Sequence, residues 1–243
     1  MDAWAVVAVI VAVLAVLLYW LLVVTEGTYL GPRIVTLLYD WTAPRYDRIK
    51  NLQYIHEMQR LGIPLAEALR DAAAPRVLDV ATGTGRLPLA LLHQEDLASR
   101  VVGVDRSAPM LAQARAAMDG YDRVMLIQGD AGALPFGDGT FHAVTCLEAL
   151  EFMWDPRAVV REMARVLEPG GALLVSNRVG RDALLFPGRL CGRGRLERFL
   201  KQAGFVAVVS QRWQVHYDLV WGRKAPLNAR SGRHHIGLES DEA

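Results

Sequence analysis

The sequence has few cysteines and almost no net charge. Its only two cysteines, Cys146 and Cys191, lie far apart, with neither CxxC nor metal-ligand spacing. We therefore expect reduced thiols in a cytosolic domain and no metal site. A net charge of +1 and the lack of a basic aromatic strip disfavour nucleic acid as a partner. No internal repeat is visible, and 243 residues suffice for one sizeable domain plus an appendage.

The sequence does contain one long apolar run, residues 3–24, AWAVVAVIVAVLAVLLYWLLVV. As a helix it would be about 33 Å long, which matches a hydrocarbon core of roughly 30 Å. A signal peptide would have a basic n-region and a small-residue cleavage site, whereas here only the acidic Asp2 precedes the run. We predict a retained single-pass transmembrane helix; a cleaved signal peptide and a buried core helix are the alternatives.

The charges flanking the apolar run predict its orientation. No lysine or arginine precedes the run, whereas Arg33, Arg45, Arg48 and Lys50 follow it. Basic residues stay on the cytoplasmic side, so the chain after the run is expected there.

Domain boundaries follow from Gly, Pro and polar stretches. They predict a hinge at 25–33, a helical N-terminal lid region at 34–74, a main domain at 75–225 and a disordered tail at 226–243.

Short apolar runs alternate with helical patterns across the main domain. The runs RVLDVA, RVVGVD, RVMLIQGD, FHAVTCL and GALLVSN read as strands, with helical segments such as APMLAQARAAM and PRAVVREMARVL among them. Strands that are apolar on both faces indicate a parallel sheet covered on both sides. The region after residue 195 predicts a helix and two runs that pair as a hairpin. We therefore expect a doubly wound α/β fold with a mostly parallel seven-stranded sheet and a C-terminal antiparallel hairpin.

The turn after the first predicted strand has the features of a nucleoside site. Gly83 and Gly85 allow close backbone approach to a ligand, and Asp105, at the end of the next strand, can accept hydrogen bonds from ribose hydroxyls. The helix that follows the turn offers free N–H groups. A dinucleotide fingerprint requires a third small residue where this chain has Pro88. Asp79 disfavours a pyrophosphate and suits a cation, so S-adenosyl-L-methionine is the predicted cofactor.

Four motifs in order extend this pattern over about 100 residues. They are D-x-A-x-G-x-G from Asp79 to Gly85, VVGVDRSAPMLAQAR, QGDAGALPFGDGTFHAVTCLEALEFMWDP and REMARVLEPGGALLVSN. The chain resembles class I S-adenosylmethionine-dependent methyltransferases. With APRYDRI at 43–49, it looks most like the methyltransferase type 11 group that includes the ubiquinone/menaquinone-biosynthesis enzymes. Ala81 replaces the usual first glycine, and His142 replaces an aspartate at a strand start, where we expect a structural role.

The resemblance implies a role for each matching residue. Tyr46 contributes to a lid, and Leu147 closes one side near the sulfonium. Helix capping is the alternative role for Asp79 and Asp105, turn formation for Asp130, and core packing for Met110. The implied cofactor contacts are the methionine portion for Asp79, Ala81, Thr82, Gly83 and Gly85, the ribose for Asp105, and the adenine for Arg106, Met110, Asp130 and Ala131.

Methyl transfer needs a base only when the acceptor must lose a proton. Glu148 is the candidate catalytic base and Glu151 a second one, although exposed loop acids are the alternative. Phe152 and Trp154 are candidates for an apolar acceptor pocket. A membrane anchor favours a small, lipophilic acceptor, such as a quinone precursor, an isoprenoid or a lipid. A catalytically silent cofactor-binding scaffold is the main alternative function, and a nicotinamide-dependent oxidoreductase is the other; the sequence does not predict the oligomeric state.

Overall fold

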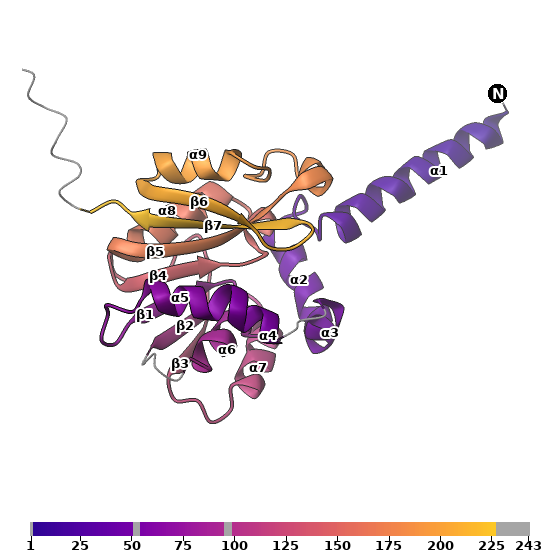
Figure 1. Ribbon diagram of the computed structural model, residues 1–243. Coiled ribbons are helices and arrows are strands. Elements are labelled where there is room, and N and C mark those ends of the chain that lie inside the picture. The colour runs from indigo at the N-terminus through magenta and orange to yellow at the C-terminus, as the bar shows by residue number, and fades with distance from the viewer. Residues whose placement is uncertain (1, 51–53, 95–98, 227–243) are drawn as a thin grey trace, which may run out of the picture.

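A seven-stranded sheet forms the centre of the chain in a computed structural model that describes residues 2–50, 54–94 and 99–226 (Figure 1). Its strand order is β3-β2-β1-β4-β5-β7-β6. The first five strands run parallel, and β7 is antiparallel to both β5 and β6. The predicted fold class is therefore confirmed. The strands are β1 Arg76–Val80, β2 Arg100–Asp105, β3 Val124–Gln128, β4 Phe141–Cys146, β5 Leu167–Arg178, β6 Phe205–Arg212 and β7 Tyr217–Lys224.

Both faces of the sheet are covered because alternate residues of its central strands point to opposite sides. In β1, Val77 belongs to the apolar cluster that contains Leu87 of one helix, whereas Leu78 belongs to the cluster that contains Met163 of another. This arrangement explains why the central strands are apolar at nearly every position. The helices concerned are α5 Ile63–Ala68 and α6 Arg86–Leu92 for the first cluster, and α8 Pro156–Val166 and α9 Arg195–Gln202 for the second.

Local capping residues fix where two helices begin. Helix α7, Ala108–Ala117, starts after Ser107, whose hydroxyl accepts from the Met110 N–H at 3.2 Å. Helix α8 starts after Asp155, which accepts two backbone N–H bonds at 2.9 and 3.0 Å. Each helix has proline in its first turn, where the missing N–H costs nothing. Strand β5 begins earlier than predicted, because Leu167 already pairs with Phe141 before the register shifts.

The N-terminal apolar run forms one helix that projects away from the domain (Figure 1). It consists of α1, Ala3–Tyr19, and a π-helical turn η1, Trp20–Val24. Its mean hydropathy is 3.1 and none of it is buried. Within the described residues, it is the only helix long and apolar enough to span a membrane, a test that a signal sequence also passes.

The segment that follows the apolar helix packs against the domain. In the predicted hinge at 25–33, Thr25 and Thr28 are buried, and the Thr28 carbonyl accepts from the Arg189 guanidinium at 3.2 Å. The described residues of 34–74 form several short helical segments; the helix type changes beside Pro44 and beside Pro64, but residues 54–68 stay helical throughout, without the predicted break at Pro64. These are α2 Pro32–Thr42, η2 Ala43–Arg45, α3 Tyr46–Lys50, α4 Tyr54–Glu57, η3 Met58–Gly62 and α5.

The predicted disordered tail lies outside the described residues from Leu227 onward.

The remaining short helices, η4 Leu150–Phe152 and η5 Gly180–Leu185, follow the carboxyl ends of β4 and β5. Because β1 to β5 are parallel, their carboxyl ends lie at one edge of the sheet. Helix α2 lies at the same edge, and this edge contains the site.

Candidate functional site

The turn between β1 and α6 has an unusual backbone at three positions. Ala81, Gly83 and Gly85 all have positive φ, at 56°, 55° and 90°. A Cβ at Gly83 would meet nothing within 4 Å, whereas a Cβ at Gly85 would lie 2.7 Å from the Met118 Cε atom. The two glycines thus serve different purposes. Gly83 leaves the turn open toward a ligand, and Gly85 lets α6 pack beside α7.

Asp105, at the end of β2, is held by backbone N–H groups. Its Oδ2 accepts from the Gly83 N–H at 2.8 Å and its Oδ1 from the Ser107 N–H at 2.9 Å. Burial raises the pKa of Asp105, and these backbone hydrogen bonds oppose the rise. Each carboxylate oxygen keeps a further lone pair. The arrangement therefore fits a ligand with two adjacent hydroxyl donors, such as a ribose.

Asp130, after β3, is a second acid at this edge. Its Oδ1 accepts from the Gly132 N–H and its Oδ2 from the Arg106 Nη2, both at 2.9 Å. The Asp130–Arg106 ion pair is about half exposed on both sides. It fixes the acid beside Ala131 and contributes little net charge to the site.

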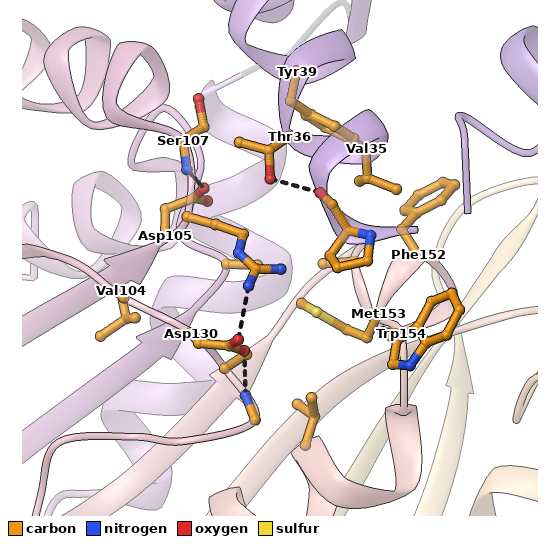
Figure 2. A pocket seen from close by; sticks show the side chains of 18 of the residues that line it. Val35, Thr36, Tyr39, Val104, Asp105, Ser107, Asp130, Phe152, Met153 and Trp154 are labelled. Carbon is orange, nitrogen blue, oxygen red and sulfur yellow. Dashed lines mark hydrogen bonds and ion pairs between the residues drawn. The ribbon is translucent and has the colours of Figure 1, made fainter. Parts of the chain in front are cut away.

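A cavity of about 360 Å³ lies over this edge of the sheet, a size typical of small-molecule sites. Figure 2 shows Asp105 and Asp130 on one side of the cavity and Phe152, Met153 and Trp154 on the other. Twelve of the residues singled out in the sequence line it: Tyr46, Ala81, Gly83, Asp105, Arg106, Met110, Asp130, Ala131, Leu147, Glu148, Phe152 and Trp154.

Asp79, Thr82 and Gly85, also singled out, are not among the lining residues. The carboxylate of Asp79 lies beneath the turn, where it accepts from the Thr82 hydroxyl at 2.8 Å and the Thr145 hydroxyl at 2.6 Å. Burial without a cationic partner raises its pKa to about 6, although the two hydroxyls oppose this rise. Its predicted contact with the methionine portion therefore stays a prediction.

Glu148, after β4, lies at the cavity with a positive φ of 49°. Its Oε1 accepts from the Arg86 Nη1 at 2.6 Å and the Gln214 Nε2 at 2.8 Å, and its Oε2 from the Lys50 Nζ at 3.1 Å. Burial raises its pKa, but the Arg86 and Lys50 charges more than offset this and lower it. A carboxylate held ionised by three donors is a weak base, and this geometry favours a positioning role.

Glu151, the other candidate base, is not among the cavity-lining residues. It is buried, and its Oε1 accepts from the Arg178 Nε at 3.0 Å and from the Tyr217 hydroxyl. Burial and the neighbouring Glu151 charge raise the pKa of Tyr217.

His142 accepts from the Arg76 N–H at 3.0 Å near the start of β4, away from the cavity. This position is consistent with its expected structural role.

The sequence did not reveal the wall that α2 contributes to the cavity. Val35, Thr36 and Tyr39 line it, and the Tyr39 hydroxyl donates to the half-buried Glu26 carboxylate at 2.6 Å. Burial raises the pKa of Glu26. The one available signal was the spacing of residues 35, 36 and 39, which places them on one face of a helix.

Two hydrogen bonds attach this N-terminal region to the predicted motifs. The Ser107 hydroxyl donates to Asp40 at 2.5 Å, and the Thr84 hydroxyl donates to Asp47 at 2.6 Å. The region predicted as a lid therefore contacts the turns after β1 and β2. Tyr46, between the two acids, faces the cavity, as expected for a lid residue.

Comparison with known proteins shows what the domain resembles. Residues 77–171 match the methyltransferase domain family. A demethylmenaquinone methyltransferase of Clavibacter sepedonicus is 35% identical over 144 residues, which are 59% of this chain and 58% of that protein. The corresponding enzyme of Thermus thermophilus is 37% identical over 139 residues, 57% of this chain and 63% of that one. The chain thus spans less than two thirds of the length of these curated relatives.

One solved structure with a similar fold is named for a different activity. The [4+2]-cyclase SpnF matches with a TM-score of 0.57 and 25% identity over 69% of this chain and 80% of its own. The predicted resemblance is thereby confirmed for the domain, and its family and fold imply S-adenosyl-L-methionine as the methyl donor. The cyclase also shows that this fold supports more than one chemistry.

Proposed function

We propose that this chain, whose residues 77–171 match the methyltransferase domain family, is an S-adenosylmethionine-dependent methyltransferase that methylates a small lipophilic acceptor of the quinone-precursor class. The observation that supports this most directly is the cavity, which joins an acidic, backbone-fixed side to an aromatic one. The relatives from Clavibacter sepedonicus and Thermus thermophilus are named demethylmenaquinone methyltransferases.

The acidic side fits the cofactor. Asp105 would hold the ribose hydroxyls, Gly83 would allow the methionine portion to approach the turn, and Asp130 with Ala131 would contact the adenine. When bound, S-adenosyl-L-methionine supplies an electrophilic methyl group beside a positive sulfur. Among the acids that line this end of the cavity, Asp130 and Glu148 are paired with arginine or lysine, whereas Asp105 is held only by hydrogen bonds and would offer a carboxylate to a cationic ligand.

The apolar side would position the acceptor and exclude water. Val35 and Phe152 belong to one apolar cluster, and Tyr39 packs edge-on against Phe152 at a centroid distance of 6.2 Å. Methyl transfer depends on alignment of the acceptor atom with the methyl group and the sulfur, so such rigid walls contribute by orienting the acceptor. Glu148 would support this geometry through Arg86 and Lys50. Methylation of a quinol also releases one proton from the acceptor, which would pass to water, because the two cations keep Glu148 a weak base.

The helix at Ala3–Val24 would anchor the chain in a membrane, with the domain on the cytoplasmic side. Its length and hydropathy, and the basic residues after it, support this part of the proposal. An anchored domain meets lipid-dissolved acceptors at a high local concentration.

A labelling assay tests the function. The full chain in lipid vesicles is supplied with demethylmenaquinol and methyl-labelled S-adenosyl-L-methionine, and the products are divided between organic solvent and water. We expect label in the organic phase, and its loss when S-adenosylhomocysteine is added in excess. Cofactor binding without any organic-soluble label, across quinol, isoprenoid and phospholipid acceptors, would overturn the proposal and support the silent scaffold.

A further inference from the structure

Large apolar side chains are exposed on α2 and on the segments that contact the base of the N-terminal helix. Leu184 is 79% exposed, Trp41 73% and Trp154 64%, although such side chains usually lie in the interior. Large apolar surface that is exposed in this way marks an interaction site. We call this set the apolar collar; it consists of Leu30, Leu37, Trp41, Trp154, Leu184 and Leu185.

One part of the collar adjoins the base of the apolar helix. The ring of Trp20, in the last turn of that helix, stacks on Tyr29 with centroids 5.2 Å apart. The Tyr29 hydroxyl donates to the Pro187 carbonyl at 2.8 Å. This contact places the segment that bears Leu184 and Leu185 next to the point where the apolar helix leaves the domain.

Another part of the collar forms the rim of the cavity. Trp154 lines the cavity and is also largely exposed, so it lies at the mouth. A Cβ atom added to Gly31, at the start of α2, would lie 4.0 Å from the Cζ3 atom of the Trp154 ring. The buried Arg189 guanidinium donates to the Trp154 carbonyl at 2.8 Å and to the Thr28 carbonyl at 3.2 Å, which ties the rim to the segment after the helix. Figure 2 shows Trp154 beside Phe152 and Met153 at this side of the cavity.

Helix α2 contributes Leu37 and Trp41 to the apolar collar. Val35 and Tyr39 face the cavity, while Leu37 and Trp41, four residues apart, lie on another face of the helix and are exposed. Arg33 precedes them by one turn and is exposed, and Arg181 is exposed one turn before Leu184. Aromatic, leucine and arginine side chains together are typical of a surface that rests on anionic lipid head groups.

The unburied apolar helix indicates what covers the collar. Any partner that covers these side chains must also accommodate a 22-residue helix of which nothing is buried. A bilayer satisfies both requirements, because the helix crosses it and the collar enters its interfacial layer.

We propose that the apolar collar lies in the interfacial layer of an anionic bilayer, so that the cavity opens toward the lipid and the acceptor enters past Trp154. This inference rests on the proposed function for the anchor and for the lipophilic acceptor. It adds that the domain docks on the membrane in one orientation, with Asp105 and Asp130 on the side of the cavity away from Trp154.

Site-directed spin labelling tests the orientation on the full chain. Leu184→Cys is labelled with a nitroxide, and Met125→Cys is the matched control, because Met125 is 60% exposed on β3, remote from the carboxyl ends of the strands. The native Cys146 and Cys191 are buried. The chain is placed in vesicles of phosphatidylcholine and phosphatidylglycerol and, separately, in detergent-free nanodiscs of the same lipids.

The label at residue 184 is expected to lose accessibility to a water-soluble nickel chelate and to gain it to oxygen, while the label at residue 125 stays accessible to nickel. Full nickel access at 184 in a chain that floats with the vesicles would overturn the docked orientation and leave the anchor intact. A chain that does not float with the vesicles would overturn both. Occlusion at 184 in micelles of a non-lipid detergent with a co-purifying protein would favour a protein partner and overturn the proposal.

An activity measurement separates this inference from the proposed function. Leu184→Ser should raise the KM for a long-chain quinol in vesicles by about tenfold and leave the KM for a short, water-soluble quinol unchanged. Met125→Ser should change neither. An equal effect on both quinols would contradict entry from the lipid, whereas absence of all methylation together with an occluded residue 184 would overturn the function and leave the docking in place.

Discussion

The two walls of the cavity are held in place by different forces. The sheet-side wall, from the turns after β1, β2 and β3, is positioned by backbone hydrogen bonds over short sequence distances or between neighbouring strands, as at Gly83, Asp105 and Asp130. The helix-side wall is attached by side-chain hydrogen bonds at Tyr39 and Asp40, and its cavity face, with Val35 and Phe152, is formed by apolar packing between segments far apart in the sequence.

This difference suggests a division of labour. Directional hydrogen bonds fix polar groups to within a few tenths of an ångström, which suits a polar cofactor of constant structure. Apolar contacts are non-directional, so a packed wall tolerates changes in acceptor shape. If the comparison is right, substitutions in one wall should affect one ligand and leave the other unaffected.

Glu148 is the strongest test because it joins the two walls. It links Lys50, on the N-terminal side, to Arg86, beside the cofactor turn. Glu148→Gln should lower the free energy of unfolding by about 3 kcal/mol, since both cations lose a buried partner. Urea denaturation measures this, and Glu168→Gln, at the looser His142 contact of 3.9 Å, should change it by less than about 0.5 kcal/mol. A large fall in kcat with unchanged stability would instead support the predicted base.

Asp105→Ala should impair cofactor binding at the sheet-side wall and leave the helix-side wall unchanged. Loss of two charge-assisted hydrogen bonds to the ribose should weaken S-adenosylhomocysteine binding by about a hundredfold. Titration calorimetry measures the affinity, and circular dichroism checks that the variant folds. Met125→Ala should retain full affinity. Undiminished binding in a folded Asp105→Ala variant would remove the basis for the assigned cofactor site.

Asp79 lies beneath the same wall and should make stability depend on pH. Its folded pKa of about 6 exceeds the ordinary value of 3.8, so the folded chain keeps this proton over a range where the unfolded chain has lost it. The free energy of unfolding should therefore fall as pH rises from about 4 to 6, by about 2 kcal/mol. Urea unfolding of the wild type and Asp79→Asn between pH 4 and 6 should show a fall that is smaller in the variant by this amount, since the other shifted acids, such as Asp105 and Glu26, titrate in both. Parallel pH profiles would mean that Asp79 is ionised throughout.

The two walls also differ in how far the sequence predicts them. The sheet-side residues lie in motifs whose spacing is set by strand, turn and helix, so Gly83, Asp105 and Asp130 could be placed from local patterns. The contact of Tyr39 with Glu26 depends on how the segment after the apolar helix folds back, and no local pattern encodes that path. For the same reason, Glu148 was identified by position, while its partners Arg86 and Lys50 were not.

Val35→Thr is the mildest test, since it replaces a methyl group by a hydroxyl at nearly constant volume. Val35 lines the cavity on the helix side and packs beside Phe152. The KM for a lipophilic acceptor should rise by about fivefold, because the wall gains a polar group that the acceptor cannot satisfy. The affinity for S-adenosylhomocysteine should not change, and Val209→Thr, at a position on β6 that is 54% exposed, should alter neither quantity. Steady-state kinetics in vesicles and calorimetry give the two values. A loss of cofactor affinity without a change in KM would mean that α2 faces the cofactor, and that the two walls do not divide their ligands.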